Sequence, residues 1–236
     1  MHTLELTAAV LRDPDAVAQS DDPRALARLA PPLLAMSVGG ALVLGLAAGA
    51  THGPLQSAFA AVKTPALFLL PPLLVLPLVH GFATACGVTV SWTRLGIATL
   101  AGLARSGLLA GAVAPLLWLP FSLDTDYHLA VLMFVAAFGF SMLPGLATIA
   151  RAVPSGGTMR LPAVLGTMLV LGVVTAQTGW VLRPFVARPQ AELTFLRTVE
   201  ADVFSSLGAT TRSATGDYRE DWAPRGSGIM RGGGAE

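Results

Sequence analysis

Long runs of apolar residues alternate with short polar stretches along this chain of 236 residues. Five of these runs are almost free of charge. Each reaches the roughly 20 residues that an α-helix needs to cross a hydrocarbon core about 30 Å thick. The pattern predicts an all-α fold, a polytopic transmembrane bundle of five spans. The predicted spans are 31–50, 64–86, 97–119, 128–150 and 161–182.

The polar stretches divide the chain into four parts. Residues 1–30 form a polar and amphipathic N-terminal segment, and 31–183 form the transmembrane domain. Residues 184–209 would lie outside the membrane, and the spacing of their leucines and valines predicts one short amphipathic helix. The Gly, Ser, Arg and Asp content of residues 210–236 predicts a disordered C-terminal tail.

The N-terminal segment carries its own helix signals. Leu4, Ala8 and Leu11 would share one face of a short helix, which Pro14 would end. Asp22 followed by proline is the pattern of an N-cap with proline at the first helical position. Because the segment is acidic and has no basic stretch followed by an apolar core, we expect no cleavable signal peptide. The first span would then act as an uncleaved anchor.

The connections and the second span have features of their own. Residues 51–63 predict a loop with a semi-apolar stretch in the membrane interface, and residues 92–104 predict an interfacial helix that turns into the third span. Prolines inside a span free carbonyl groups that neighbouring helices or water must satisfy, so the second span should be kinked. Its prolines are Pro65, Pro71, Pro72 and Pro77.

The composition supports a membrane protein. Hydrophobic residues make up 53% and charged residues 12% of the chain, whereas soluble domains carry about 25% charged residues. A net charge of +1 without a clustered basic face argues against a nucleic-acid partner. Lys63 is the single lysine beside many arginines, and alanine is abundant, which indicates a GC-rich bacterial genome. Cys86 is the single cysteine; it allows no intrachain disulfide and is interpreted as a buried, inert thiol.

The basic residues also predict the orientation. Five spans put the two termini on opposite sides of the membrane. A cytoplasmic N-terminus satisfies the positive-inside rule, because Lys63 is then the only basic residue of the short outer loops. Arg183, Arg188 and Arg197 argue the other way. We expect a bacterial inner-membrane protein with a cytoplasmic N-terminus and a periplasmic C-terminus. The cytoplasmic arginines would be Arg12, Arg24, Arg28, Arg94, Arg151 and Arg160.

The placement of the acidic residues argues against several kinds of membrane chemistry. No Asp or Glu lies between Asp22 and Asp124, or between Asp126 and Glu192, so every predicted span lacks an acid. Proton relays and cation-coupled transporters usually carry an acid within the membrane, and an intramembrane aspartyl protease needs two. The histidines are scattered and form no H-E-x-x-H motif, so we expect neither a metal nor a cofactor.

A serine in the fourth span offers the nearest approach to a nucleophile. Residues 139–142 resemble the G-x-S of rhomboid serine proteases, but no histidine follows Ser141 to act as its base. A core serine that hydrogen-bonds a helix carbonyl is the better interpretation. The sequence therefore predicts no catalytic residue and no enzyme.

Two polar residues in the spans are candidate interaction sites. Arg105 either snorkels to the cytoplasmic headgroups or contacts a lipid phosphate or a partner there. Gln177, near the outer end of the last span, would form an interhelical hydrogen bond or part of a binding site. The small residues at Gly107 and Gly111, and at Gly172 and Ala176, favour close helix packing within the chain over a dimer interface.

The end of the last span resembles a known family. Residues 176–185, AQTGWVLRPF, are similar to a signature of bacterial polytopic proteins related to the Yip (Rab-interacting, five-span) superfamily. Residues 11–14, the five-span layout and the tail over 195–207 are similar too, so the resemblance extends to about residue 207. The proline-rich second span and the Gly-rich end depart from the pattern. The resemblance implies a five-span fold and an adaptor role like that of eukaryotic relatives, which act in membrane trafficking without catalytic residues.

Physical chemistry assigns local roles within this motif. Trp180 fits an interfacial anchor, Arg183 a contact to headgroups or carbonyls, and Pro184 a helix stop. The alternative is a specific recognition site that would include Phe185.

We therefore expect a non-enzymatic integral inner-membrane protein, Yip-like, that serves as a scaffold, adaptor or accessory subunit of a membrane complex. Its partners would be the lipid bilayer and a membrane protein not identified by the sequence. The alternative is a transport or lipid-handling protein, in which the proline-broken second span lines a cavity and Arg105 and Gln177 provide polar contacts.

Overall fold

The computed structural model describes residues 3–18, 20–50, 53–85, 87–123, 127–152, 160–186 and 195, all within one compact unit, Met1–Thr198. These residues form helices and no strand, which confirms the all-α prediction. Cys86, the turn at Asp124 and Asp126, the helix predicted within 184–209 and the tail 210–236 lie outside the described residues. The helices are α1 Thr3–Arg12, α2 Pro14–Ala18, α3 Pro23–Gly49, α4 Pro54–Ala85, α5 Trp92–Phe121, α6 Tyr127–Ala152 and α7 Arg160–Leu182.

Five of these helices, α3 to α7, are long and apolar enough to cross a membrane, which confirms the predicted number of spans and makes this a multi-pass membrane protein by length and composition. Two expectations about the connections were wrong. The loop predicted for 51–63 is mostly the beginning of α4, because Pro54 lacks the N–H that a first helical turn leaves unpaired and the residues after it are apolar. Residues 92–104 are the first turns of a continuous α5.

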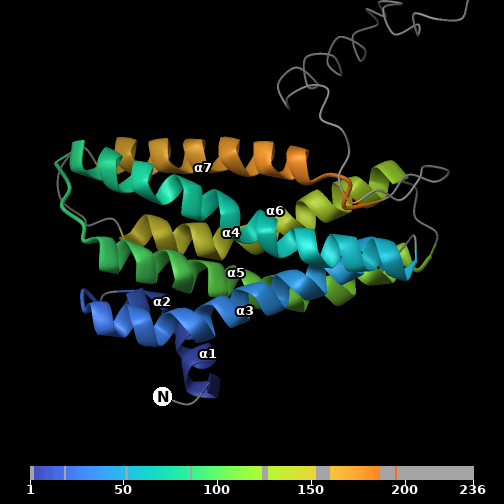
Figure 1. The fold of residues 1–236 in the computed structure, drawn as a ribbon, viewed down its shortest axis with the longest axis horizontal. Coiled ribbons are helices and arrows are strands. Elements are labelled where there is room, and N and C mark those ends of the chain that lie inside the picture. Colours follow the sequence, from blue (N-terminus) through green and yellow to red (C-terminus); the bar gives the residue numbers. More distant parts are fainter. Residues whose placement is uncertain are drawn as a thin grey trace, which may run out of the picture. The chain divides into compact units, whose positions relative to one another are not determined.

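The long helices alternate in direction along the bundle (Figure 1). One end, here called the proximal end, holds α1 and α2 together with the beginnings of α3, α5 and α7. The other, the distal end, holds the beginnings of α4 and α6 and the last turns of α3, α5 and α7. This alternation is what five consecutive crossings with short connections require.

Glycine allows the central helices to touch backbone to backbone. A Cβ added at Gly40 on α3 would overlap the carbonyl of Gly107 on α5, and one at Gly102 on α5 would lie 2.7 Å from the carbonyl oxygen of Gly145 on α6. A Cβ at Gly111 would lie 3.5 Å from the Cα of Gly40. The G-x-x-x-G of α5 therefore packs within the chain, as predicted.

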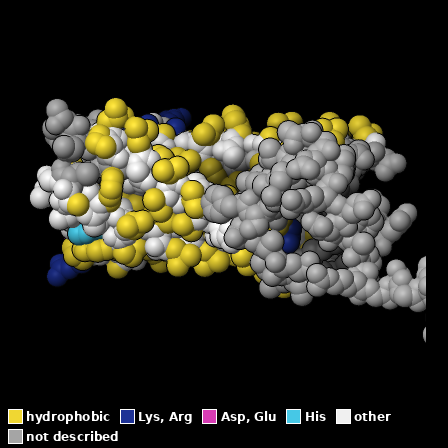
Figure 2. Space-filling view, turned by 90° about the horizontal axis from the view of Figure 1, so that it is seen from above, with side chains coloured by type: hydrophobic (Ala, Val, Ile, Leu, Met, Phe, Trp, Pro, Cys, Tyr) yellow, Lys and Arg dark blue, Asp and Glu magenta, His cyan; other side chains and the backbone are white. Residues whose placement is uncertain are grey.

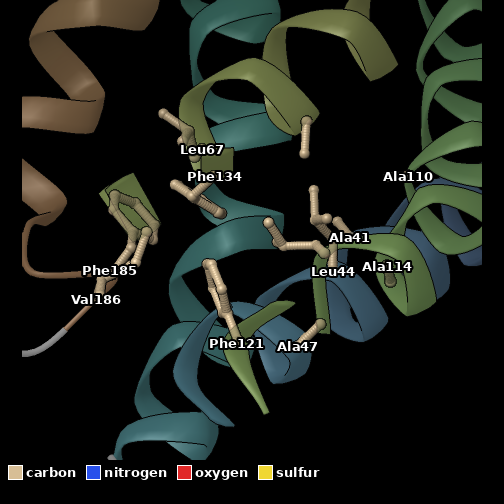
Figure 3. Close-up of a cluster of buried hydrophobic side chains, with 14 of the residues drawn as sticks. Ala41, Leu44, Ala47, Leu67, Ala110, Ala114, Phe121, Phe134, Phe185 and Val186 are labelled. Atoms are coloured by element: carbon tan, nitrogen blue, oxygen red, sulfur yellow. The ribbon is translucent and has the colours of Figure 1, made fainter. Parts of the chain in front are cut away.

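An aromatic core fills the distal end of the bundle (Figure 3). Phe68 of α4 meets Phe138 of α6 edge to face, with 5.1 Å between the ring centroids. Phe134 of α6 stacks on Phe185, which follows α7, with 5.0 Å between centroids. Such aromatic pairs contribute about 0.5–1.5 kcal/mol beyond the area that they bury. The core therefore joins the chain after α7 to the rest of the bundle.

The last helix lies at the edge of the bundle. α7 packs mainly against α4 (Figure 1), and only 11% of its most apolar window is buried. Hydrophobic side chains cover much of the described face that is seen from above in Figure 2. The exposed large side chains of α7 include Leu161, Leu165, Leu169, Val173 and Val181. This face can meet lipid or another membrane helix.

The short N-terminal helices pack on the proximal end. Leu6 and Val10 of α1 are buried against α3 and α5, whereas Leu4 is 83% exposed. The predicted face of Leu4, Ala8 and Leu11 is therefore not the packed one, because the contact surface is set by the helices beneath it. Asp15 of α2 forms an ion pair of 2.9 Å with Arg151 of α6. Both side chains are well exposed, so this pair contributes at most about 1 kcal/mol.

Hydroxyl side chains within the spans bond to their own helices. Ser141 is fully buried and donates to the carbonyl oxygen of Ala137 at 2.7 Å. Thr64, Thr99 and Thr148 make the same bond to the residue four positions earlier. The prediction of a core serine bonded to a helix carbonyl is confirmed.

The predicted N-cap of the first span is also confirmed and leads to a first testable prediction. Asp22 Oδ1 accepts a hydrogen bond of 2.9 Å from the backbone N–H of Arg24, and Pro23 begins α3. Replacing Asp22 by alanine leaves that N–H without its partner and should lower the free energy of unfolding by about 1 kcal/mol. Thermal unfolding in detergent measures the change. The matched control is Arg28→Ala on the exposed side of the same helix, which should change stability little.

Candidate functional site

Two polar residues of α4 are buried at its distal end. Gln56 and Lys63 are seven residues apart, which is two helical turns, and so lie on one face. Gln56 is 0% and Lys63 1% exposed. A lysine buried this deeply in an apolar helix needs partners for its donors, since burying a cation without them costs several kcal/mol.

The partners are backbone carbonyls of the chain that follows α7. Lys63 Nζ donates to the Pro184 carbonyl oxygen at 3.0 Å, and Gln56 Nε2 donates to that of Phe185 at 3.0 Å. These carbonyls are available because α7 ends at Leu182 and Pro184 cannot continue it. We call this set of four residues, Gln56, Lys63, Pro184 and Phe185, the distal latch.

Aromatic rings complete the surroundings of Lys63. Its Nζ lies 4.9 Å from the ring centroid of Phe195, which in turn meets Phe59 of α4 edge to face at 5.2 Å. A ring face attracts a cation by about 0.5–2 kcal/mol, more where water is excluded. Among the described residues, Lys63 is therefore held by a carbonyl and a ring and not by a carboxylate.

Arg183 lies at the junction between α7 and the latch. Its guanidinium carbon is 3.5 Å from the ring centroid of Trp180, one turn earlier on α7. This contact was not among the roles predicted for Trp180 and Arg183, which stay predictions, whereas α7 ends before Pro184 as predicted. Arg183 Nε and Gln56 Oε1 are buried with no hydrogen-bond partner among the described residues. Within the part of the chain that the structure describes, these two polar atoms are therefore available to a further partner.

The structure brings together three of the five predicted interaction residues. Trp180 and Arg183 stack on each other, and Phe185 enters both the latch and the aromatic core. Gln177 is one turn further back on α7, with Oε1 buried and unpaired among the described residues. Arg105 belongs to a different region, since its neighbours on α5 pack against α1 and α3.

Gln56 and Lys63 were missed by the sequence prediction. The signal was present, because Lys63 is the single lysine of the chain and Gln56 precedes it by two helical turns. The polar pattern of residues 51–63 predicts a loop outside the spans, so it gives no reason to expect either side chain in the bundle. The carbonyls that they bind are about 120 positions later in the sequence, with separations of 121 and 129 residues. Only the folded chain places them together.

The hydrogen bonds of the distal latch attach one part of the chain to another. Its donors are directed at backbone oxygens of the same chain, so it fastens the segment after α7 onto α4. Within the described residues, no three His, Cys, Asp or Glu side chains come together as metal ligands would.

Comparison with known protein families, with curated proteins and with solved structures gave no match for this chain. The resemblance of residues 176–185 to the Yip-related signature therefore stays a prediction from sequence.

Proposed function

We propose that this chain is a Yip-like scaffold, adaptor or accessory subunit in a bacterial inner membrane, and that it catalyses no reaction. The proposal rests on one observation, which is that α7 is exposed along its side and attached at its end. This helix is exposed along most of its apolar length, while its distal end is fastened by Lys63 and Gln56. A fixed helix with an open side is suited to receive a helix of another membrane protein, because association in lipid depends on close packing between preformed helices.

The orientation is part of the proposal. Arg24, Arg28, Arg94 and Arg151 belong to elements that meet at the proximal end, whereas Lys63 and Arg183 lie at the distal end. This distribution supports a cytoplasmic proximal end and a periplasmic distal end under the positive-inside rule.

Site-specific photocrosslinking tests the adaptor role. A photoreactive amino acid placed at Leu165 or Leu169 of α7, which are 58% and 70% exposed, should crosslink in native membranes to one membrane protein. The matched control is Leu132, which is 65% exposed but belongs to another helix, α6, and should give adducts with lipid. Adducts with lipid alone from all three positions would contradict the proposal.

A transport role receives little support from the described part of the bundle. The gap between α4, α5, α6 and α7 is apolar and has a volume of about 10 Å³, with Pro72, Thr99 and Thr167 in its lining. A space of this size holds about one water molecule. Neither Arg105 nor Gln177 lines it. Lipid handling, the other part of the alternative, is favoured by a polar cleft at the proximal end.

A further inference from the structure

This polar cleft, of about 470 Å³, opens at the proximal end of the bundle, where α4 ends and α5 begins. Its volume is in the range of small-molecule sites, which is about 300–1,000 Å³. All but one of its lining residues have polar side chains, unlike those of the gap inside the bundle. The lining residues are Asp21, His80, Thr84, Thr89, Val90, Ser91 and Arg94.

The turn between α4 and α5 gives the cleft a defined wall. Gly87 has φ of +74°, and its N–H bonds to the Thr84 carbonyl oxygen at 2.9 Å. The N–H of Val88 bonds to the Ala83 carbonyl oxygen at 2.9 Å. These two bonds are those of a Schellman turn, for which glycine is the favoured residue at the left-handed position. The turn holds the residues that follow it against the start of α5.

Two opposite charges line the cleft without pairing with each other. Arg94 Nε is buried and has no hydrogen-bond partner among the described residues. Asp21 accepts a hydrogen bond from the hydroxyl of Ser91, and in the described part of the chain it forms no ion pair with Arg94. Ser91 also accepts the N–H of Arg94 as the N-cap of α5. The N–H of Arg94 is thus capped, and its guanidinium group lines the cleft with a donor that has no partner among the described residues.

An aromatic pair beside the cleft indicates a position at a membrane surface. His80 stacks on Trp92, with 4.1 Å between the ring centroids and 11° between the planes. Trp92 is 51% exposed, and tryptophan is typical of the level of lipid headgroups. A ligand with a polar head in the cleft would therefore lie at the level of Trp92 and of the lipid headgroups.

We propose that this cleft binds the headgroup of a zwitterionic aminophospholipid, with Arg94 donating to the phosphate and Asp21 accepting from the ammonium group. Guanidinium is suited to phosphate because its N–H groups form paired, charge-assisted bonds with phosphate oxygens. An acidic headgroup without an amine would leave Asp21 facing a like charge, so the cleft should select against it. The site is independent of the adaptor role, which depends on α7.

Lipid retention by the full-length protein tests the proposal. The purified protein is exchanged into mixed micelles that hold equal amounts of phosphatidylethanolamine, phosphatidylglycerol and phosphatidylcholine, and native mass spectrometry counts the lipids that stay bound. Phosphatidylethanolamine should be enriched. Arg94→Gln should reduce its retention about tenfold, which corresponds to about 1.4 kcal/mol. Asp21→Asn should remove the preference over phosphatidylglycerol, since Asn keeps an oxygen for Ser91 but loses the charge.

Controls separate this site from general lipid binding and from misfolding. Arg24→Gln removes an exposed arginine of the same end and should leave lipid retention unchanged. Asp21 is exposed, so Asp21→Asn should unfold at the wild-type temperature. Equal retention of the three lipids by the wild type, or retention that neither variant alters, would overturn the proposal. If soluble glycerophosphoethanolamine at equal concentration displaced the lipid, the cleft would bind the free headgroup as well as the lipid. This result would contradict the proposal that the natural ligand is a lipid.

Discussion

Replacing Gly40 by leucine is expected to prevent α3 from packing on α5 and to produce the largest loss of stability of any single change considered. Any Cβ at this position overlaps the backbone carbonyl of Gly107, and a backbone atom between two packed helices cannot move aside as a flexible side chain can. The free energy of unfolding should fall by more than about 3 kcal/mol. Thermal unfolding and size-exclusion chromatography in detergent would show an early transition and aggregated protein.

The adjacent glycine provides a matched control. Gly39 is on the same helix, and an added Cβ there has no heavy atom within 4 Å. Gly39→Leu should therefore remain folded and monodisperse. If Gly40→Leu unfolded at the same temperature as Gly39→Leu, the result would contradict a close backbone contact between Gly40 and Gly107.

Replacing Lys63 by methionine is expected to open the distal latch while the bundle stays folded. The change removes the donor to the Pro184 carbonyl, a charged hydrogen bond of about 1.5–3 kcal/mol. It also removes the cost of a buried cation, which offsets part of that loss in the overall stability. The larger change should therefore be local, in how often the chain at Val186 separates from the aromatic core.

Thiol labelling measures this opening. In a Cys86→Ser background, Val186→Cys introduces a reporter at a position that is 3% exposed. Lys63→Met should raise its labelling rate by maleimide about tenfold, the equivalent of 1.4 kcal/mol. Gln56→Leu should raise it by a smaller factor, because Gln56 is uncharged. Val62→Ala, at an exposed position beside Lys63, is the control and should leave the rate unchanged. An unchanged rate in Lys63→Met would show that the latch does not hold this segment.

The elements that were predicted well depend on local sequence. Apolar runs of about 20 residues can be satisfied in a membrane only as helices, so their number and approximate positions follow from composition. The N-cap at Asp22, the helix end before Pro184 and the bond from Ser141 to Ala137 each involve residues within four positions of one another. Such features are readable because the partner is a neighbour along the chain.

The errors occurred where a neighbour in space overrides the local pattern. The segment over 51–63 contains Gly53, polar residues and Lys63, which together resemble a loop. In the fold, α3 packs closely on it, since a Cβ at Gly45 would lie 2.5 Å from the Ala60 carbonyl oxygen. A buried face and partners for Lys63 make the helix favourable there. The packed face of α1 was missed for the same reason.

By itself, the sequence determined that this chain is a helical membrane protein with five spans, because a hydrocarbon environment leaves no other way to satisfy so many backbone groups. It also identified Trp180, Arg183 and Phe185 as residues of one motif at the end of the last span. Only the tertiary structure decided which residues these three side chains contact. Lys63 and Gln56 reach carbonyls 121 and 129 positions away, and Asp21 lines a cleft with His80 and Arg94. Such contacts depend on which helices pack together, and that is decided by shape complementarity at glycine contacts, which the order of apolar and polar residues does not encode.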